Sequence, residues 1–147
     1  IVARGHMMSA AAMGATAFQK GLGAIHSLSH PIGAIHHTHH GMTNAVFMPY
    51  VLAFNRPAIE ERVARAAAYI GIKGGFDGFM KAVLKLRKDL KVPHALPGLI
   101  KGVTLDKKQK GLIADMAIVD PTAGGNPVKL TKKAALQILE AAIEGAV

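Results

Sequence analysis

Residues 21–45 read GLGAIHSLSHPIGAIHHTHHGMTNA and contain six of the chain's eight histidines, together with four glycines and one proline. The first 55 residues contain no Asp or Glu, so no carboxylate lies near these imidazoles in the sequence. Imidazole nitrogens bind metal ions and transfer protons near neutral pH. The composition of this segment therefore favours a metal or catalytic site.

Three of the histidines have a spacing that can bring their rings together. His26 and His30 are four positions apart, so on a helix they project from the same face. His40 follows beyond Pro31, where a second helix can return its ring to the first two. Neutral imidazoles suit zinc or ferrous iron, whose catalytic sites usually add a carboxylate. That ligand has to come from a distant part of this chain or from outside it.

A less specific interpretation applies to each histidine taken singly, because a histidine in an apolar helix is more often a core residue than a ligand. The three together favour function. His36, His37 and His39 lie in the expected turn, where we expect solvent exposure. His6 and His94 receive no role.

The first half of the chain has the pattern of helices interrupted by prolines. Residues 9–25 are rich in Ala and Met and apolar on all sides, which predicts a buried central helix. Pro31 predicts a kink or an end of the helix at His30. A further helix is expected over residues 42–54, kinked at Pro49.

The second half shows the same helical periodicity, with capping residues and loops between the segments. Asn55 and Pro57 are a typical helix start, Pro93 is a typical stop, and Thr104 and Thr131 can serve as N-caps. The expected helices cover residues 58–70, 76–92, 105–119 and 132–142. Because no alternating strand pattern or internal repeat is found, we predict one all-α domain over residues 1–147, a bundle of about six or seven helices.

Composition narrows the possible functions. The 147 residues are half apolar, enough to bury a core, and the absence of cysteine excludes disulfides and thiolate sites and agrees with a cytoplasmic location. No apolar run is long enough for a membrane span, and the N-terminus has no signal-peptide pattern, so no membrane is expected as a partner.

The net charge of +9 keeps a basic nucleic-acid-binding helical domain as an alternative. Its lysines are spread at helical spacing with few aromatic residues, so we expect no nucleic acid as a partner.

The histidine segment, extended to GLGAIHSLSHPIGAIHHTHHGMTNAVFMPYVLAFN, resembles the second signature of the iron-containing (group III) alcohol dehydrogenase family. The similarity begins at AFQKGLG and continues to DPTAGGNPVKLT, which resembles the family's Asn-Pro loop before the last helix. Enzymes of this family have an N-terminal α/β domain that holds NAD(P) and a C-terminal helical domain that supplies most of the metal site. The present chain resembles the helical domain only.

The resemblance implies a role for each of the three histidines. His26 and His40 match metal-binding histidines, and His30 matches the histidine between metal, nicotinamide and substrate, which makes it both the catalytic and the cofactor-binding candidate. The family's other ligands, an Asp and a His, lie on a helix before this segment. Their absence here, the absence of a nucleotide-binding loop and the start at Ile1 lead us to expect that an N-terminal nucleotide-binding domain is missing.

The implied activity is oxidation of an alcohol to an aldehyde or ketone, or the reverse, by hydride transfer to NAD or NADP. The metal is expected to be Fe(II), with zinc as the second possibility, and it would lower the pKa of the alcohol oxygen. The expected partners are a small alcohol or aldehyde, the chain's own N-terminal domain and further copies in a homo-oligomer, and the isolated chain is expected to be inactive. The other alternative is a non-catalytic, His-rich metal-binding module.

Overall fold

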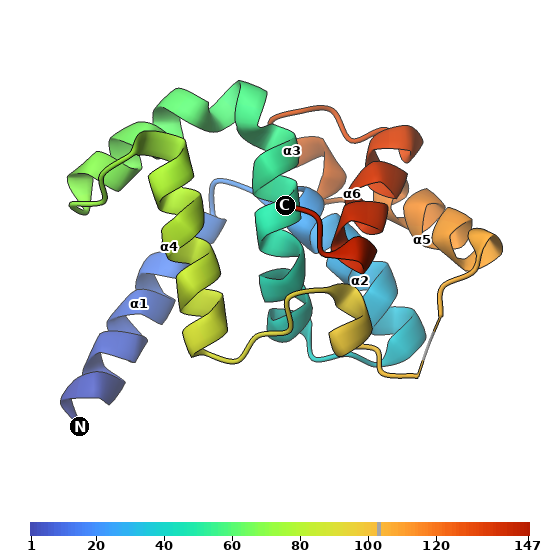
Figure 1. Ribbon diagram of the computed structural model, residues 1–147, viewed down its shortest axis with the longest axis horizontal. Helices are drawn as coiled ribbons and strands as arrows, with labels where there is room; N and C mark the ends of the chain where they lie inside the picture. The colour runs from blue at the N-terminus through green and yellow to red at the C-terminus, as the bar shows by residue number, and fades with distance from the viewer. Residues whose placement is uncertain (103) are drawn as a thin grey trace.

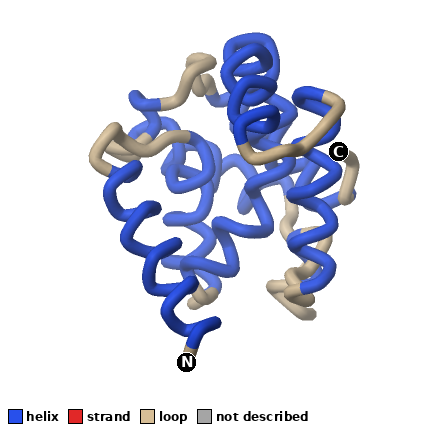
Figure 2. The backbone as a smooth tube through the Cα atoms, turned by 90° about the vertical axis from the view of Figure 1, so that its left-hand side faces the viewer, coloured by secondary structure: helices blue, strands red, loops and turns tan. Residues whose placement is uncertain are grey.

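The computed structural model describes residues 1–102 and 104–147, which form α-helices and no β-strand (Figure 2). The α-helices are α1 (Val2–Phe18), α2 (Ala24–His36), α3 (His40–Tyr69), α4 (Gly75–Asp89), α5 (Lys107–Val119) and α6 (Lys132–Glu144). Two short 3-10 turns, η1 (Leu96–Gly98) and η2 (Ala123–Gly125), lie in the loops before α5 and α6. The all-helical class and the number of helices predicted from the sequence are confirmed for the described residues.

The long helix α3 runs through the middle of the molecule, with α4 on one side and α2, α5 and α6 on the other (Figure 1). The core lies on this second side, where these helices bury their apolar faces against one another. Its largest fully buried side chains include Leu28, Ile32, Phe47, Ile113, Ile138 and Leu139. The helix that carries His26 and His30 is therefore fixed in the best-packed part of the structure.

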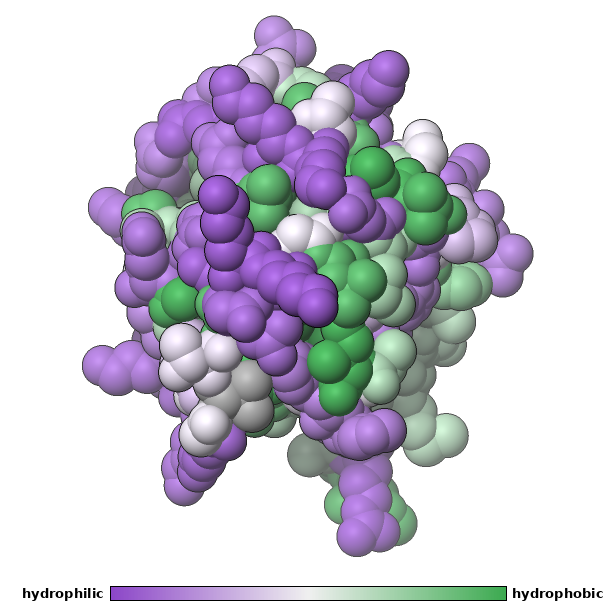
Figure 3. Space-filling model, turned by 90° about the vertical axis from the view of Figure 1, so that its right-hand side faces the viewer, coloured by the Kyte–Doolittle hydropathy of each residue, from purple (hydrophilic) through white to green (hydrophobic). Residues whose placement is uncertain are grey.

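The face formed by α5 and α6 is mainly hydrophilic, with small apolar areas between the polar side chains (Figure 3). Some of its lysines make ion pairs, such as Lys110 with Glu140 at 2.9 Å and Lys132 with Asp115 at 2.7 Å. These ion pairs join α5 to α6 at the surface and neutralise part of the excess positive charge locally.

The buried central helix expected over residues 9–25 is wrong. α1 covers Val2–Phe18 and none of its residues is buried, and among the described helices none packs along it. It projects from the bundle at the lower left of Figure 1. Its Ala and Met residues have a high helix propensity, which favours formation of the helix. A high propensity does not supply a neighbouring surface against which the helix could be buried. No helix in the described residues is both long enough and apolar enough to cross a membrane.

The prolines interrupt fewer helices than expected. α2 continues past Pro31, and Pro31 itself is buried in the helix. α3 continues past both Pro49 and Pro57, so the separate helix expected to start at residue 58 is wrong. Each proline removes one backbone hydrogen bond, but packing of the buried face can outweigh that loss. α3 does change direction in its second half (Figure 1), as expected for a helix with an internal proline.

The caps of the last two helices differ in how well they were predicted. Thr131 caps α6 by accepting from the Ala134 N–H, as expected. The cap of α5 is Asp106 rather than Thr104, and it forms a capping box with Gln109. A carboxylate at the N-cap and a glutamine at the third helical position satisfy two free backbone N–H groups, which a threonine at position 104 does not.

Candidate metal centre

The three histidines selected from the sequence lie together, although they come from two helices. His26 and His30 project from α2, and His40 is the first residue of α3. The centroids of the His26 and His40 rings are 5.2 Å apart, and the His30 ring lies 5.9 Å from His26 and 5.4 Å from His40. The predicted convergence is therefore present.

The facing nitrogens of His26 and His40 share one hydrogen-bond partner, the side-chain amide of Asn44. Asn44 Nδ2 lies 3.2 Å from Nε2 of His26 and 3.0 Å from Nε2 of His40. Asn44 follows His40 by one helical turn, so both side chains lie on the same face of α3. Two imidazole nitrogens are thus directed at one small volume.

His30 has a different partner, the carboxylate of Asp120 at the end of α5. Its Nδ1 lies 2.7 Å from Asp120 Oδ2. Asp120 also accepts hydrogen bonds from the backbone N–H and the hydroxyl of Thr122, at 2.8 and 2.6 Å. Because an ionised carboxylate can only accept, this contact puts the ring proton of His30 on Nδ1 and leaves Nε2 with a free lone pair.

Two pKa values in the cluster lie below their ordinary values, those of His26 and Asp120. Burial lowers the pKa of His26, and the neighbouring imidazoles of His40 and His30 lower it further, while Asp120 opposes this. Burial alone would raise the pKa of Asp120, but hydrogen bonds from Thr122 and His30 outweigh it, so this pKa lies below its ordinary value. His26 is therefore held neutral and Asp120 ionised at neutral pH, the forms in which imidazole binds a metal and carboxylate accepts a proton.

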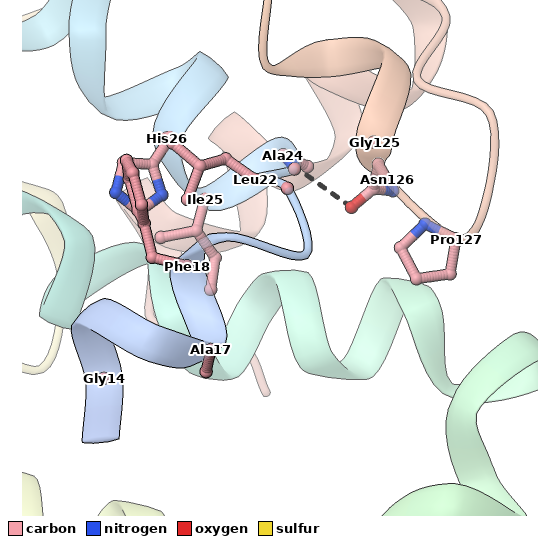
Figure 4. Close-up of a pocket in the computed structure, with 12 residues that line it drawn as sticks. Gly14, Ala17, Phe18, Leu22, Ala24, Ile25, His26, Gly125, Asn126 and Pro127 are labelled. Atoms are coloured by element: carbon pink, nitrogen blue, oxygen red, sulfur yellow. Dashed lines mark hydrogen bonds between the residues drawn. The ribbon is translucent and has the colours of Figure 1, made fainter. Parts of the chain in front are cut away.

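The start of α2 is held by the loop before α6. The N-cap of α2 is Gly23, which has no side chain to cap the helix. Asn126 supplies the cap instead, because its Oδ1 accepts from the Ala24 N–H at 3.1 Å (Figure 4). The same side chain exchanges two hydrogen bonds with the buried Asn55 of α3, at 2.8 and 2.9 Å. One amide thus fixes α2 against α3 and sets the direction of His26.

Close backbone contact completes this arrangement. A Cβ on Gly125 would lie 2.0 Å from the Leu22 carbonyl oxygen, so only glycine allows the two loops to approach this closely. A pocket of about 500 Å³ lies beside this contact, between the end of α1 and the two loops, and His26 lines it (Figure 4). The ring of a candidate ligand is therefore accessible from this side.

The remaining histidines lie outside the cluster. His37 and His39 are exposed as expected, and His39 caps α3 by accepting from the Met42 N–H at 3.3 Å. His36 is half-buried rather than exposed. The His94 ring contacts the Gly145 carbonyl oxygen at 3.0 Å, far from the cluster in sequence.

Sequence analysis missed Asn44 and Asp120. Asn44 could have been found, because its position one turn after His40 places it on the same helical face. The sequence predicts that a helix ends at residue 119, but nothing local predicts the contact of Asp120 with a ring 90 positions earlier. A carboxylate from a distant part of the chain therefore lies next to His30 rather than beside His26 and His40.

The donors of this cluster suit a divalent metal but do not complete its coordination. Two imidazole nitrogens facing one point are suitable ligands for zinc or ferrous iron. In residues 1–102 and 104–147, no group of three His, Cys, Asp or Glu side chains is arranged to hold a metal ion. The chemistry of His26 and His40 thus suits two ligands of a metal ion, and the described residues do not add a third to them.

Comparison with known protein families finds that residues 1–143 match the model of the Fe-containing alcohol dehydrogenase family, C-terminal. The NADPH-dependent butanol dehydrogenase of Clostridium saccharobutylicum is 33% identical over 97% of this chain and 38% of its own length. The 4-hydroxybutyrate dehydrogenase of Cupriavidus necator is 41% identical over 85% of this chain and 34% of its own length. The chain thus spans little more than a third of the length of these relatives.

Solved structures give the same result. A crystal structure of 1,3-propanediol oxidoreductase is 29% identical and has a TM-score of 0.74 over 83% of this chain and 33% of that one. An iron-containing alcohol dehydrogenase from Thermococcus thioreducens is 28% identical, also with a TM-score of 0.74, over 84% of this chain and 32% of that one. The helical arrangement described above is therefore the one found in these enzymes.

Proposed function

The chain belongs to the Fe-containing alcohol dehydrogenase family, and we propose that it forms the helical, metal-holding part of an NAD(P)-dependent alcohol dehydrogenase. The observation that carries this proposal is the convergence of His26 and His40, whose Nε2 atoms face the same point. The reaction is the oxidation of an alcohol to an aldehyde or ketone, or its reverse. Fe(II) is the proposed metal and zinc the second candidate.

The proposed metal ligands in this chain are His26 and His40. A divalent metal bound there would supply a Lewis acid for the alcohol oxygen. The two rings come from different helices, so their relative position depends on the contact of Asn126 with Ala24 and Asn55. The packing of α2 against α3 therefore sets the distance between the two ligand nitrogens.

His30 is the proposed catalytic and nicotinamide-facing residue. Its hydrogen bond to Asp120 orients the ring and keeps the proton on Nδ1. Nε2 can then accept a proton from the alcohol and return it in the reverse reaction. This assigns to Asp120 the role of a positioning residue, which acts on the substrate only through His30.

The proposed partners are a small alcohol or aldehyde, NAD or NADP, and the N-terminal nucleotide-binding domain that family members carry. We also propose a homo-oligomer for the complete enzyme. The isolated chain is proposed to be inactive, because the hydride acceptor is bound mainly by the N-terminal domain.

A hybrid enzyme tests this function directly. The present chain replaces the matching C-terminal part of the butanol dehydrogenase from C. saccharobutylicum, and its circular dichroism and NADPH binding establish that it is folded. We expect alcohol-dependent reduction of NADP that is lost in the His26→Ala hybrid. A folded hybrid that binds metal and NADPH without any turnover would contradict an enzymatic role and favour the non-catalytic metal-binding module.

A further inference from the structure

The side chain of Asn44 occupies a position between the two proposed metal ligands. Its Nδ2 lies within 3.2 Å of Nε2 in both His26 and His40. An amide nitrogen carries two N–H groups and has no lone pair for accepting, so it donates one hydrogen bond to each ring. Both Nε2 atoms are therefore acceptors, and both rings carry their proton on Nδ1.

A metal ion would use the same two lone pairs. Zinc lies about 2.0–2.1 Å from an imidazole nitrogen, on the side on which that nitrogen would accept a hydrogen bond. One lone pair cannot serve an N–H group and a metal ion at once. The Asn44 amide and a metal ion bound by both rings therefore exclude each other.

The oxygen end of the Asn44 amide is not held by a hydrogen bond in the described part of the chain. Its Oδ1 is buried and has no hydrogen-bond partner among the described residues. A buried acceptor without a partner is unfavourable, and a rotation that brings Oδ1 to water relieves this cost. Among the described residues, only the two contacts with the imidazoles hold this amide by hydrogen bonds.

We propose that Asn44 is a positioning residue that takes the place of the metal in the metal-free chain and is displaced when the metal binds. The inference rests on the proposed role of His26 and His40 as metal ligands. Before binding, the amide holds both rings in the tautomer that a metal requires and directs their lone pairs to one point. During binding, its two hydrogen bonds have to be broken, so they weaken the metal affinity.

The first test concerns the metal-free chain alone. Long-range ¹H–¹⁵N spectra of the histidine-labelled chain report which ring nitrogen carries the proton in His26 and His40. We expect Nδ1–H in both rings of the unchanged chain and a loss of this uniform preference in Asn44→Ala. An Nε2 proton on either ring of the unchanged chain, or identical tautomers in the variant, would overturn the proposal.

The second test is a titration of the metal-free hybrid enzyme with Zn²⁺, followed by the resonances of the two rings and of the Asn44 side-chain amide. We expect the amide resonances to shift as zinc binds, and Asn44→Ala to bind zinc about tenfold more tightly, since two neutral hydrogen bonds are no longer broken. Gln137→Ala removes an exposed amide from α6 and should leave the affinity unchanged. Equal or weaker binding by Asn44→Ala would overturn the displacement.

This titration distinguishes a failure of the Asn44 proposal from a failure of the proposed metal ligands. Zinc binding that is lost in His26→Ala but unchanged in Asn44→Ala would overturn the role of Asn44 and leave the metal ligands in place. Absence of zinc binding in the unchanged hybrid enzyme, in its Asn44→Ala variant and in its Gln137→Ala variant would overturn both the displacement and the ligand role of the two histidines.

Discussion

The His30 ring and the Asp120 carboxylate are separated by 90 positions in the sequence and joined by a hydrogen bond of 2.7 Å. The contact links the middle of α2 to the end of α5, beside the two rings proposed to hold the metal. It gives one imidazole of the cluster a fixed tautomer and an acceptor for its Nδ1 proton. His30 is thereby distinguished from His26 and His40, whose Nε2 atoms face Asn44.

Replacing this carboxylate should therefore reduce turnover without removing the metal. In the hybrid enzyme, Asp120→Asn can donate a hydrogen bond to His30 Nδ1 and favour the wrong tautomer, so we expect kcat to fall roughly tenfold or more. Asp115→Asn, which alters an exposed carboxylate on the same helix, is the matched control. An unchanged kcat in Asp120→Asn would show that the carboxylate does not position His30.

The same variant predicts a pH dependence of stability. Because the pKa of Asp120 is lowered in the folded chain, its stabilising effect is fully present above the ordinary value of 3.8 and is lost as the pH falls through the lower folded value. Urea unfolding should show Asp120→Asn less stable by about 1–2 kcal/mol at neutral pH. This difference should shrink only when the pH falls below 3.8, and a difference that is constant down to full protonation would contradict the shift.

The sequence predicted the parts of the fold that depend on local pattern. The end of α5 at Val119 and the Thr131 cap of α6 follow from capping chemistry and proline placement, which act over a few residues. The convergence of His26, His30 and His40 follows from helical spacing plus one turn. These features required no knowledge of how distant helices pack.

The features that were missed depend on tertiary packing. The sequence predicts Asn55 as part of a helix start, but it is buried within α3 and its partner Asn126 lies 71 positions away. The sequence likewise predicts a helix start at Pro57, but α3 continues past it. The contact of Asp120 with His30 likewise depends on how α2 crosses α5, which residue periodicity does not specify.

The close contact between the two glycine-containing loops gives a stability prediction. Gly125→Ala places a Cβ 2.0 Å from the Leu22 carbonyl oxygen, a backbone atom that cannot move freely. We expect the free energy of unfolding to fall by about 1–3 kcal/mol, the usual cost of overpacking. The neighbouring Gly124→Ala meets no atom within 4 Å and should change it by less than about 0.5 kcal/mol. Equal stability of the two variants would show that the loops do not meet as described.

His30 should separate catalysis from metal binding. In the hybrid enzyme, His30→Ala is expected to retain the metal and lose roughly 10²-fold or more in kcat, the contribution of a positioned acid or base. Both quantities are measured on one preparation, by elemental analysis and by steady-state kinetics. Loss of metal would make His30 a ligand, and unchanged metal and kcat would make it a core histidine without function.

The metal content of the hybrid enzyme tests the central claim most directly. Elemental analysis compares the unchanged sequence with His26→Ala, His40→Ala and the exposed control His37→Ala. The account predicts that the first two variants each lose the metal, because a site with one of its few ligands removed is under-coordinated and open to water, whereas His37→Ala keeps it. Full metal content in His26→Ala or in His40→Ala would contradict the assignment of these two histidines as ligands.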